Sequence, residues 1–316
     1  MKRLEQQALE ADRQSVVKLL SSLPDNDVLG QASFRSRLSE IDRQLEAIGK
    51  PSPDDFSGSV ALLFTGGPVI GSRSVETNFA ARITTAFQDL VSKRIATGEI
   101  GKLGSRGPLP THSDSSLAIS QMVRGSVGFV LEEVTRNQTL TDSVVKKAIE
   151  QIDDLIAKTG GESEEDFEAT VESIDDRQLV SLRDFFKALD ETAATVRIIE
   201  SVRELSLDGA AVRRGRQRAE MVEIEEQERE DVEGVLMGLL PESRRFEMEL
   251  SPGVTIKGSV AASFASDYMK LLHGPDADRL VGKRWRAKMR VREVRERNKP
   301  PRSLYTLLGL LRQIEG

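Results

Sequence analysis

The sequence predicts an α+β fold in three parts: an N-terminal helical hairpin, a central mixed α/β unit with several helices, and a C-terminal small antiparallel sheet of barrel-like curvature. Three observations support this expectation. Apolar residues recur at helical spacings of three and four in residues 1–50 and in parts of 56–190. Within 56–190, short apolar runs bounded by turn residues interrupt these helices. From 191 to 316 such runs follow one another, as in a bent sheet or barrel.

Length and composition limit the class of protein. At 316 residues the chain is longer than one hydrophobic core usually serves, so two or three packed units are expected. The absence of cysteine excludes disulfides, thiolate metal sites and cysteine nucleophiles, and it favours a cytoplasmic location. The polar N-terminal residues predict no signal peptide, and the apolar runs are too short to cross a bilayer, so no membrane partner is expected.

Residues 1–50 predict two amphipathic helices. The first is broken at Leu23-Pro24, and the second stops at Gly49, shortly before Pro51. Because the connection is short, an antiparallel, coiled-coil-like hairpin is expected. Each helix is apolar on one face only, so the pair must pack on the rest of the molecule or on a second copy. The apolar positions of the second helix are Phe34, Leu38, Ile41, Leu45 and Ile48.

The central part, 56–190, predicts strands and helices joined by glycine-rich turns. A linker at 51–58 leads into a buried strand at 60–64. Ser74 is the expected N-cap of a long helix that stops at Gly98. The remaining expected elements are an exposed loop at 101–116, strands at 117–123 and 127–134 with a turn at 124–126, and helices at 141–158, 163–173 and 176–190.

The C-terminal part, 191–316, predicts mainly strands. A helix at 208–219 carries four arginines, and a second helix is expected at 264–272. The predicted strands are 195–199, 204–207, 221–226, 232–239, 246–250, 254–260, 285–294 and 304–310.

The glycine-rich turn from Gly66 to Gly71 lies between a predicted strand and a predicted helix, where a phosphate can bind helix-terminal N–H groups. It has neither the Gly-Lys-Ser/Thr ending nor the Gly-x-Gly-x-x-Gly spacing of nucleotide sites, and Pro68 removes one donor. A tight structural turn is therefore the preferred interpretation, and ligand binding there stays open.

No residue pattern predicts a catalytic or metal site. The two histidines, His112 and His273, are far apart in the sequence. Ser113 and Asp114 adjoin His112, but a catalytic triad needs convergence in space, and no Gly-x-Ser-x-Gly elbow occurs. Acidic pairs are numerous, yet most flank helix starts, where carboxylates are favourable. We therefore expect no catalytic residue, no metal and no cofactor.

The segment 283–302 is the most informative. It holds ten basic and two acidic residues, a local charge of +8, whereas the whole chain carries −6. Within it, apolar residues alternate with four cations, which predicts a strand with a row of cations about 7 Å apart on one face, close to the repeat of a nucleic-acid backbone. The alternative is pairing with the acidic run at 220–233 of the same molecule or of a second subunit. The candidate nucleic-acid contacts are Arg284, Arg286, Lys288, Arg290, Arg292, Arg295, Arg297, Arg213, Arg214 and Arg216.

Three functions follow as hypotheses. The first is a non-catalytic interaction or scaffold subunit of a bacterial-type intracellular assembly, which binds a second copy or another protein. The second is a nucleic-acid-binding subunit of a defence or regulatory system, which contacts DNA or RNA through the basic strand. The third is a metal-dependent nuclease.

Overall fold

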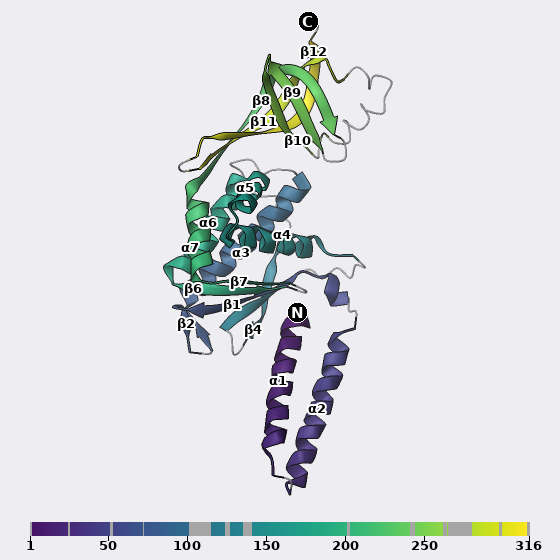
Figure 1. The fold of residues 1–316 in the computed structure, drawn as a ribbon, viewed down its shortest axis with the longest axis vertical. Coiled ribbons are helices and arrows are strands. Elements are labelled where there is room, and N and C mark those ends of the chain that lie inside the picture. Colours follow the sequence, from purple (N-terminus) through teal and green to yellow (C-terminus); the bar gives the residue numbers. More distant parts are fainter. Residues whose placement is uncertain are drawn as a thin grey trace.

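The computed structural model describes residues 2–24, 26–50, 53–71, 73–100, 115–123, 127–134, 141–200, 203–240, 244–261, 264, 280–296 and 299–314. These residues form the three predicted parts: a helical hairpin, a central unit and a closed five-stranded barrel (Figure 1). The expected α+β fold is thereby confirmed.

The hairpin consists of two long helices, α1 (Lys2–Ser22) and α2 (Val28–Ile48). The Asp27 carboxylate caps the second helix by accepting a hydrogen bond from the Gly30 N–H at 2.9 Å. Only the start of α1 reaches the central unit, and the remaining length projects away from it (Figure 1). At about 1.5 Å per residue, each helix is about 30 Å long.

The central unit is built on one antiparallel sheet with the strand order β4-β5-β1-β6-β7. Residues of β1 alternate between its two faces. Leu62 and Phe64 lie in the main core under the helices, whereas Ala61 and Leu63 lie on the opposite face, where Leu4 of α1 packs. The strands are β1 (Ser59–Gly66), β4 (Leu117–Val123), β5 (Val127–Glu133), β6 (Ala194–Ile199) and β7 (Glu204–Leu207).

Five helices supply the other half of the main core. Local capping positions several of them: Ser143, Ser163 and Asp175 each accept a hydrogen bond from a backbone N–H in the first turn that follows. The helices are α3 (Thr77–Ile100), α4 (Val144–Gly160), α5 (Glu164–Ser173), α6 (Asp176–Glu191) and α7 (Gly209–Met221). A short 3-10 helix, Pro53–Phe56, joins the hairpin to β1.

The C-terminal strands close a barrel in the order β10-β12-β11-β8-β9, with β10 and β12 parallel. The first of its five strands therefore pairs with the second and the fourth, and the third runs parallel to the fifth, which is the topology of the OB-type Greek-key barrel. The strands are β8 (Val222–Leu240), β9 (Arg245–Ser251), β10 (Val254–Val260), β11 (Arg284–Glu296) and β12 (Arg302–Ile314).

The barrel is joined to the central unit by a long ribbon that β8, β11 and β12 form at its base. Val222, Ile224 and Val294 from this ribbon are buried in the main core of the central unit. The rest of the barrel has a smaller core of its own around Leu236 and Met289. Two strands thus belong to two cores at their opposite ends.

Several predicted elements differ from the structure. The strands expected at 221–226 and 232–239 are one continuous strand, because the charged residues between them pair across to β11. Ser74 does not cap a helix: it belongs to β3 (Ser74–Val75), which pairs with β2 (Val69–Ile70), and α3 begins at Thr77 and continues past Gly98. The strands at 194–199 and 204–207, grouped by sequence with the C-terminal part, complete the central sheet.

The glycine-rich turn is explained by packing and backbone conformation. Gly66 has φ = +101°, and a Cβ there would lie 2.2 Å from the carbonyl oxygen of Ala193. Gly71, with φ = +65°, turns the chain between β2 and β3. The expected helix at 264–272, most of the loop at 101–116 and the turn at 124–126 lie outside the described residues. Among the helices that are described, none is long and apolar enough to span a membrane.

Candidate interaction surfaces

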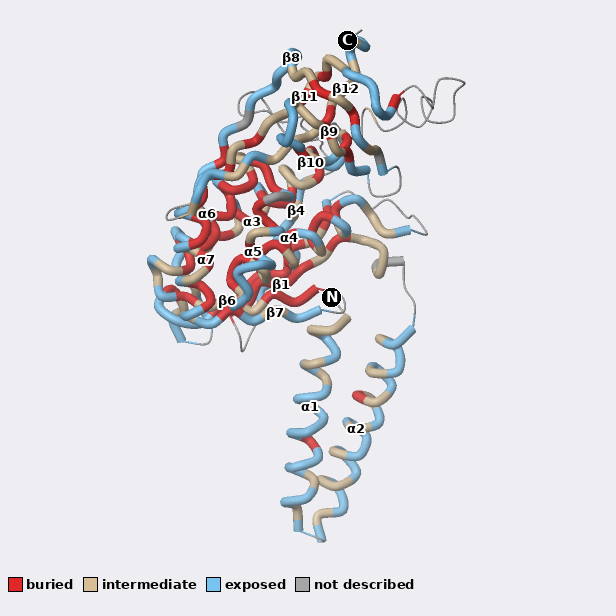
Figure 2. Tube along the Cα trace, turned by 45° about the horizontal axis from the view of Figure 1, so that its top comes forward, coloured by how far each residue is buried: buried red, intermediate tan, exposed pale blue. Residues whose placement is uncertain are grey.

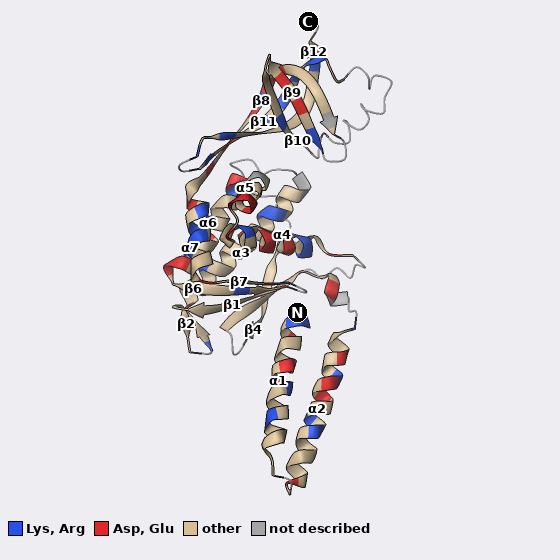
Figure 3. Ribbon diagram, in the orientation of Figure 1, with Lys and Arg blue, Asp and Glu red and all other residues tan. Residues whose placement is uncertain are grey.

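The basic strand β11 lies beside the most acidic strand of the chain. It runs antiparallel to β8, and the register places Arg286 opposite Glu233 and Arg290 opposite Glu228. Opposite charges that face each other across two strands attract directly. The acidic run and the basic run therefore meet within one molecule, which is the arrangement expected from the alternative interpretation of the sequence (Figure 3).

Four of the predicted nucleic-acid contacts form ion pairs with β8, and three of them follow one another along β11. Arg286 donates from Nε and Nη2 to one oxygen of Glu233, at 3.1 and 2.6 Å. Lys288 lies 2.8 Å from Glu230, and Arg290 donates to Glu228 at 3.0 Å. These cations keep the pKa values of Glu228 and Glu233 below the ordinary range of glutamate. The carboxylates of β8 thus neutralise much of the charge of these three cations.

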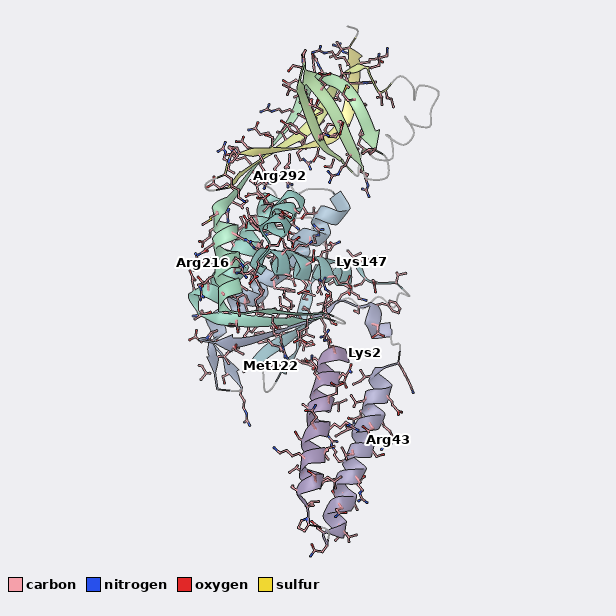
Figure 4. The ribbon with its side chains drawn as sticks, in the orientation of Figure 1. Lys2, Arg43, Met122, Lys147, Arg216 and Arg292 are labelled. Carbon is pink, nitrogen blue, oxygen red and sulfur yellow. The ribbon has the colours of Figure 1, made fainter. Side chains whose placement is uncertain are left out.

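Arg292 does not share the exposure of the three cations before it. Its side chain is 2% exposed, and Val294, two residues further on, is also buried. Inside the barrel the odd-numbered residues Ala287 and Met289 face the core. Beyond the barrel, the opposite face of β11, which carries Arg292 and Val294, turns toward the central unit. Figure 4 shows Arg292 between the barrel and the central unit. A row of four solvent-facing cations is therefore not formed.

The candidates near the two ends of β11, Arg284 and Arg295, are exposed. Arg295 bridges Glu225 at 3.3 Å and Glu293 at 3.0 Å. Arg284 is exposed at the start of β11 and contributes to the lowered pKa of Glu233. Arg297 lies outside the described residues.

The arginines of α7 point to different partners. Arg214 donates from Nε to the Gly160 carbonyl at 2.9 Å, at the end of α4. Arg216 lies between Asp190 and Glu220, at 2.9 Å from each, and these bonds raise its pKa above the ordinary value. Arg213 is exposed. Arg214 therefore ties α7 to the end of α4, and Arg216 ties it to α6.

Arg218 is a structural residue that was not among the predicted sites. Its guanidinium donates to the carbonyl oxygens of Thr159 at 3.1 Å and Gly161 at 2.6 Å, and to Glu164 at 2.9 Å. It also lies 5.1 Å above the ring of Phe167. Arg218 therefore caps the C-terminal end of α4 and ties it to α5. Its position on the buried stripe with Ala211 and Gly215, at spacings of four and three, is the sequence signal that could have found it.

The hairpin exposes much of its apolar surface. Each of its two 21-residue helices has a single buried residue, Val16 in α1 and Ile41 in α2 (Figure 2). The hairpin tip, which we define as Leu19, Val28 and Leu29, is 51%, 71% and 85% exposed. Single exposed apolar residues are ordinary, whereas three large ones at the end of a projecting element are characteristic of an interaction surface.

Two buried carboxyl groups face each other at the edge of the central sheet. Glu200 follows β6 and is 4% exposed, and burial followed by the charges of Asp153 and Glu150 raises its pKa to about 7. Burial also raises the pKa of Asp153 in α4 to about 6, against the opposing effect of Arg203. One oxygen of Asp153, Oδ1, is buried without a hydrogen-bond partner. Ionisation of these two buried groups near neutral pH therefore destabilises the folded state.

Metal-binding and histidine chemistry find no support in the described part of the chain. There, no three residues of the types His, Asp and Glu come together in a way that could hold a metal ion. Both histidines, His112 and His273, lie outside it.

Comparison with known proteins gives no relative for this chain: no family model, no curated protein and no solved structure matches it.

Proposed function

We propose that this protein is a non-catalytic interaction subunit that associates with a second copy of itself through the N-terminal hairpin. The observation that supports this most directly is the small buried area of the hairpin: one residue in each long helix. Two helices that pack only on each other leave the sides of their apolar stripes open to water. Phe34, Leu38 and Leu45 of α2 are accordingly only half-buried.

The charges of the hairpin favour an identical partner. Residues 1–50 hold eight basic and eight acidic side chains, so this surface is neutral and offers no field that selects a polyanion. Ion pairs between the two helices, Arg13 with Asp42 at 2.8 Å and Arg37 with Asp12 at 2.7 Å, flank the apolar seam. Two hairpins that pack side by side would bury their seams together as a four-helix bundle.

The base of the hairpin holds it in a defined direction. Lys2 pairs with Asp55 at 2.6 Å, and Arg3 and Gln7 both donate to Glu204 at the start of β7, at 3.3 and 2.9 Å. Because the arm is fixed at its start, a dimer formed through it would hold the two central units and barrels at a set separation. Such a function is that of a scaffold, and the cysteine-free sequence suits an intracellular assembly.

Light scattering with size-exclusion chromatography tests this proposal. The intact chain is expected to elute as a dimer or larger oligomer. The double variant Val28→Glu/Leu29→Glu should have a lower subunit number, and a chain that starts at Phe56 should be monomeric. The matched control Ser33→Glu/Ser36→Glu places the same charges on exposed positions of α2 and should behave as the parent. A monomeric parent at high concentration would refute the proposal.

A second candidate function is nucleic-acid binding by the barrel, favoured by its OB-type strand order. The ion pairs with β8 compete with phosphate contacts, so the affinity should rise when Glu228 and Glu233 are changed to Gln. Changing Arg286 and Lys288 to Gln should lower the slope of log affinity against log salt by about one for each lost contact. Gel-shift titration of DNA and RNA at two salt concentrations measures both. Unchanged binding in both variants would argue against this site.

A further inference from the structure

A cavity of about 390 Å³ opens between α3, α4 and α5. Its size is in the range of small-molecule sites. The polar and charged side chains at this cavity come from α3, α4, α5 and the turn that holds Arg203. Its apolar side chains come from α4 and the α5 region. The residues that matter for its chemistry are Arg94, Gln151, Leu155, Lys158, Ile174 and Arg203.

Arg94 is a cation in the lining of this cavity. Its Nε donates to Oε1 of Gln151 at 2.6 Å, and within the described part of the chain no carboxylate forms an ion pair with its guanidinium. Burial lowers the pKa of Arg94, and the charge of Asp175 opposes this shift. Asp175 itself accepts from the Gln178 N–H at 2.8 Å and from the Thr97 hydroxyl at 3.2 Å. The Nη donors of Arg94 therefore remain available to a ligand.

Two further cations line the same cavity. Lys158 lies 2.7 Å from Asp154, and Arg203 lies 3.8 Å from that residue, so one carboxylate serves both. Glu150 is the other acidic residue in the lining. Three cations against two carboxylates leave the lining of the cavity with a net positive charge. The carboxylate of Asp154, which pairs with Lys158 and Arg203, is partly exposed, so solvent screens these ion pairs.

Part of the remaining wall is apolar, and Thr170 and Ser173 of α5 complete it. Ile152 and Leu155 of α4 and Ile174 after α5 are buried residues of the main core that also line the cavity. Apolar walls with a few convergent polar groups are the usual composition of a ligand site. A guanidinium that points two parallel N–H groups at a ligand selects a carboxylate or a phosphate, whose two oxygens match that spacing.

We propose that this cavity binds a small organic anion, with its carboxylate or phosphate on Arg94 and its short aliphatic part against Leu155 and Ile174. This site is independent of the hairpin, and its failure would leave the self-association proposal unaffected. Lys158 and Arg203 already pair with Asp154. They therefore attract and stabilise the anion through their charge, and Arg94 supplies the direct hydrogen bonds.

Isothermal titration of the intact protein at low salt tests the proposal. The anionic probes are inorganic phosphate, glycerol 3-phosphate and 4-methylpentanoate, which distinguish a phosphate from a carboxylate ligand. The uncharged probe is 4-methylpentanamide, and the cationic probe is putrescine, which the acidic residues Glu150 and Asp154 would favour. We expect at least one anion to bind with a Kd of about 1 mM or tighter, and neither of the other two probes to bind.

Arg94→Gln should weaken anion binding at least about tenfold, because it removes one charged pair of hydrogen-bond donors. The matched control is Arg35→Gln, because Arg35 also donates to a glutamine but lies exposed on α2. Arg203→Gln, at an exposed turn, should weaken binding less and serves as the second variant if Arg94→Gln does not fold. Absence of anion binding, equal binding in Arg94→Gln, or binding of putrescine instead would overturn the proposal.

Discussion

The N-terminal hairpin and helix α4 of the central unit share the same apolar period but bury very different amounts of it. Each helix of the hairpin buries one residue in 21, whereas α4 buries nine in 17. The difference arises from the neighbours: α4 packs on α3, α5, α7 and the sheet, whereas α1 and α2 pack mainly on each other. A helical period thus fixes which face is apolar, and the tertiary fold decides whether anything covers it.

The largest expected effect is the loss of an aromatic ring from the central core. Phe185 is fully buried beside Phe186, with ring centroids 5.7 Å apart, so Phe185→Ala should lower the free energy of unfolding by about 3–5 kcal/mol. Ile41→Ala removes one of the two buried residues of the hairpin and should melt the hairpin alone.

Denaturant titration measures the first effect, and hydrogen exchange followed by mass spectrometry locates the second. If Ile41→Ala lowers the unfolding midpoint of the central unit as strongly as Phe185→Ala does, the hairpin belongs to the same cooperative unit and the comparison fails.

The next effect compares two arginines. Arg218→Ala leaves several carbonyl groups at the end of α4 without their donor and removes one of the two cations that pair with Glu164, the other being Lys299, so we expect a loss of about 2–3 kcal/mol. Arg13→Ala removes an exposed pair on the hairpin and should change stability by about 0.5 kcal/mol or less. Equal losses in thermal or denaturant unfolding would show that burial does not separate the two regions.

Stability should depend on pH through the buried carboxyls of the central unit. The folded protein raises the pKa of Glu200 to about 7 and that of Asp153 to about 6, so both groups hold protons more tightly when folded. Their contribution to the free energy of unfolding is fully present at pH values below the pKa values of the same groups in the unfolded chain. It is lost as the pH rises through about 6 and 7. The charged groups around them are Lys146, Glu150, Asp154 and Arg203.

Glu200→Gln should therefore stabilise the protein by about 1–2 kcal/mol at pH 8 and have little effect at pH 4.5. Glu46→Gln, at an exposed position of α2, is the control and should be neutral at both values. Thermal melts across this pH range measure the difference. A benefit of Glu200→Gln that is the same at pH 4.5 and pH 8 would contradict the proposed titration.

The smallest effect concerns the ion pairs that cross the hairpin. A double-mutant cycle on Asp12 and Arg37, which are 2.7 Å apart and half exposed, should give a coupling of about 0.2–1 kcal/mol that disappears in 1 M salt. A coupling well above this range would mean that charges, rather than an apolar seam, hold the hairpin together.

Local sequence patterns predicted most elements because their causes are local. The strands at 117–123, 204–207 and 254–260 have the predicted bounds, and the Ser163 hydroxyl caps α5 by accepting from the Asp166 N–H at 3.1 Å. Alternating side chains and first-turn caps involve residues only a few positions apart, so a single sequence contains them.

The charged candidate site was only partly predictable. The sequence alone showed an acidic run and a basic run, and it left open whether they pair with each other. It could not show that β8 continues through its charged middle, because those residues are stabilised by cations about sixty positions away in β11. The separate roles of Arg214, Arg216 and Arg218 likewise depend on where α4 and α6 end near α7.

The sequence by itself determined the α+β class, the helical hairpin, the approximate positions of most strands and the alternation of cations on β11, since each follows from the spacing of neighbouring residues. Only the tertiary structure decided which of these faces meet water. Arg286 and Arg292 share one face of the same strand, yet the first is half exposed and the second is buried. The reason is physical: the strand leaves the barrel and crosses onto the central unit, so the same face changes its surroundings from solvent to protein along its length.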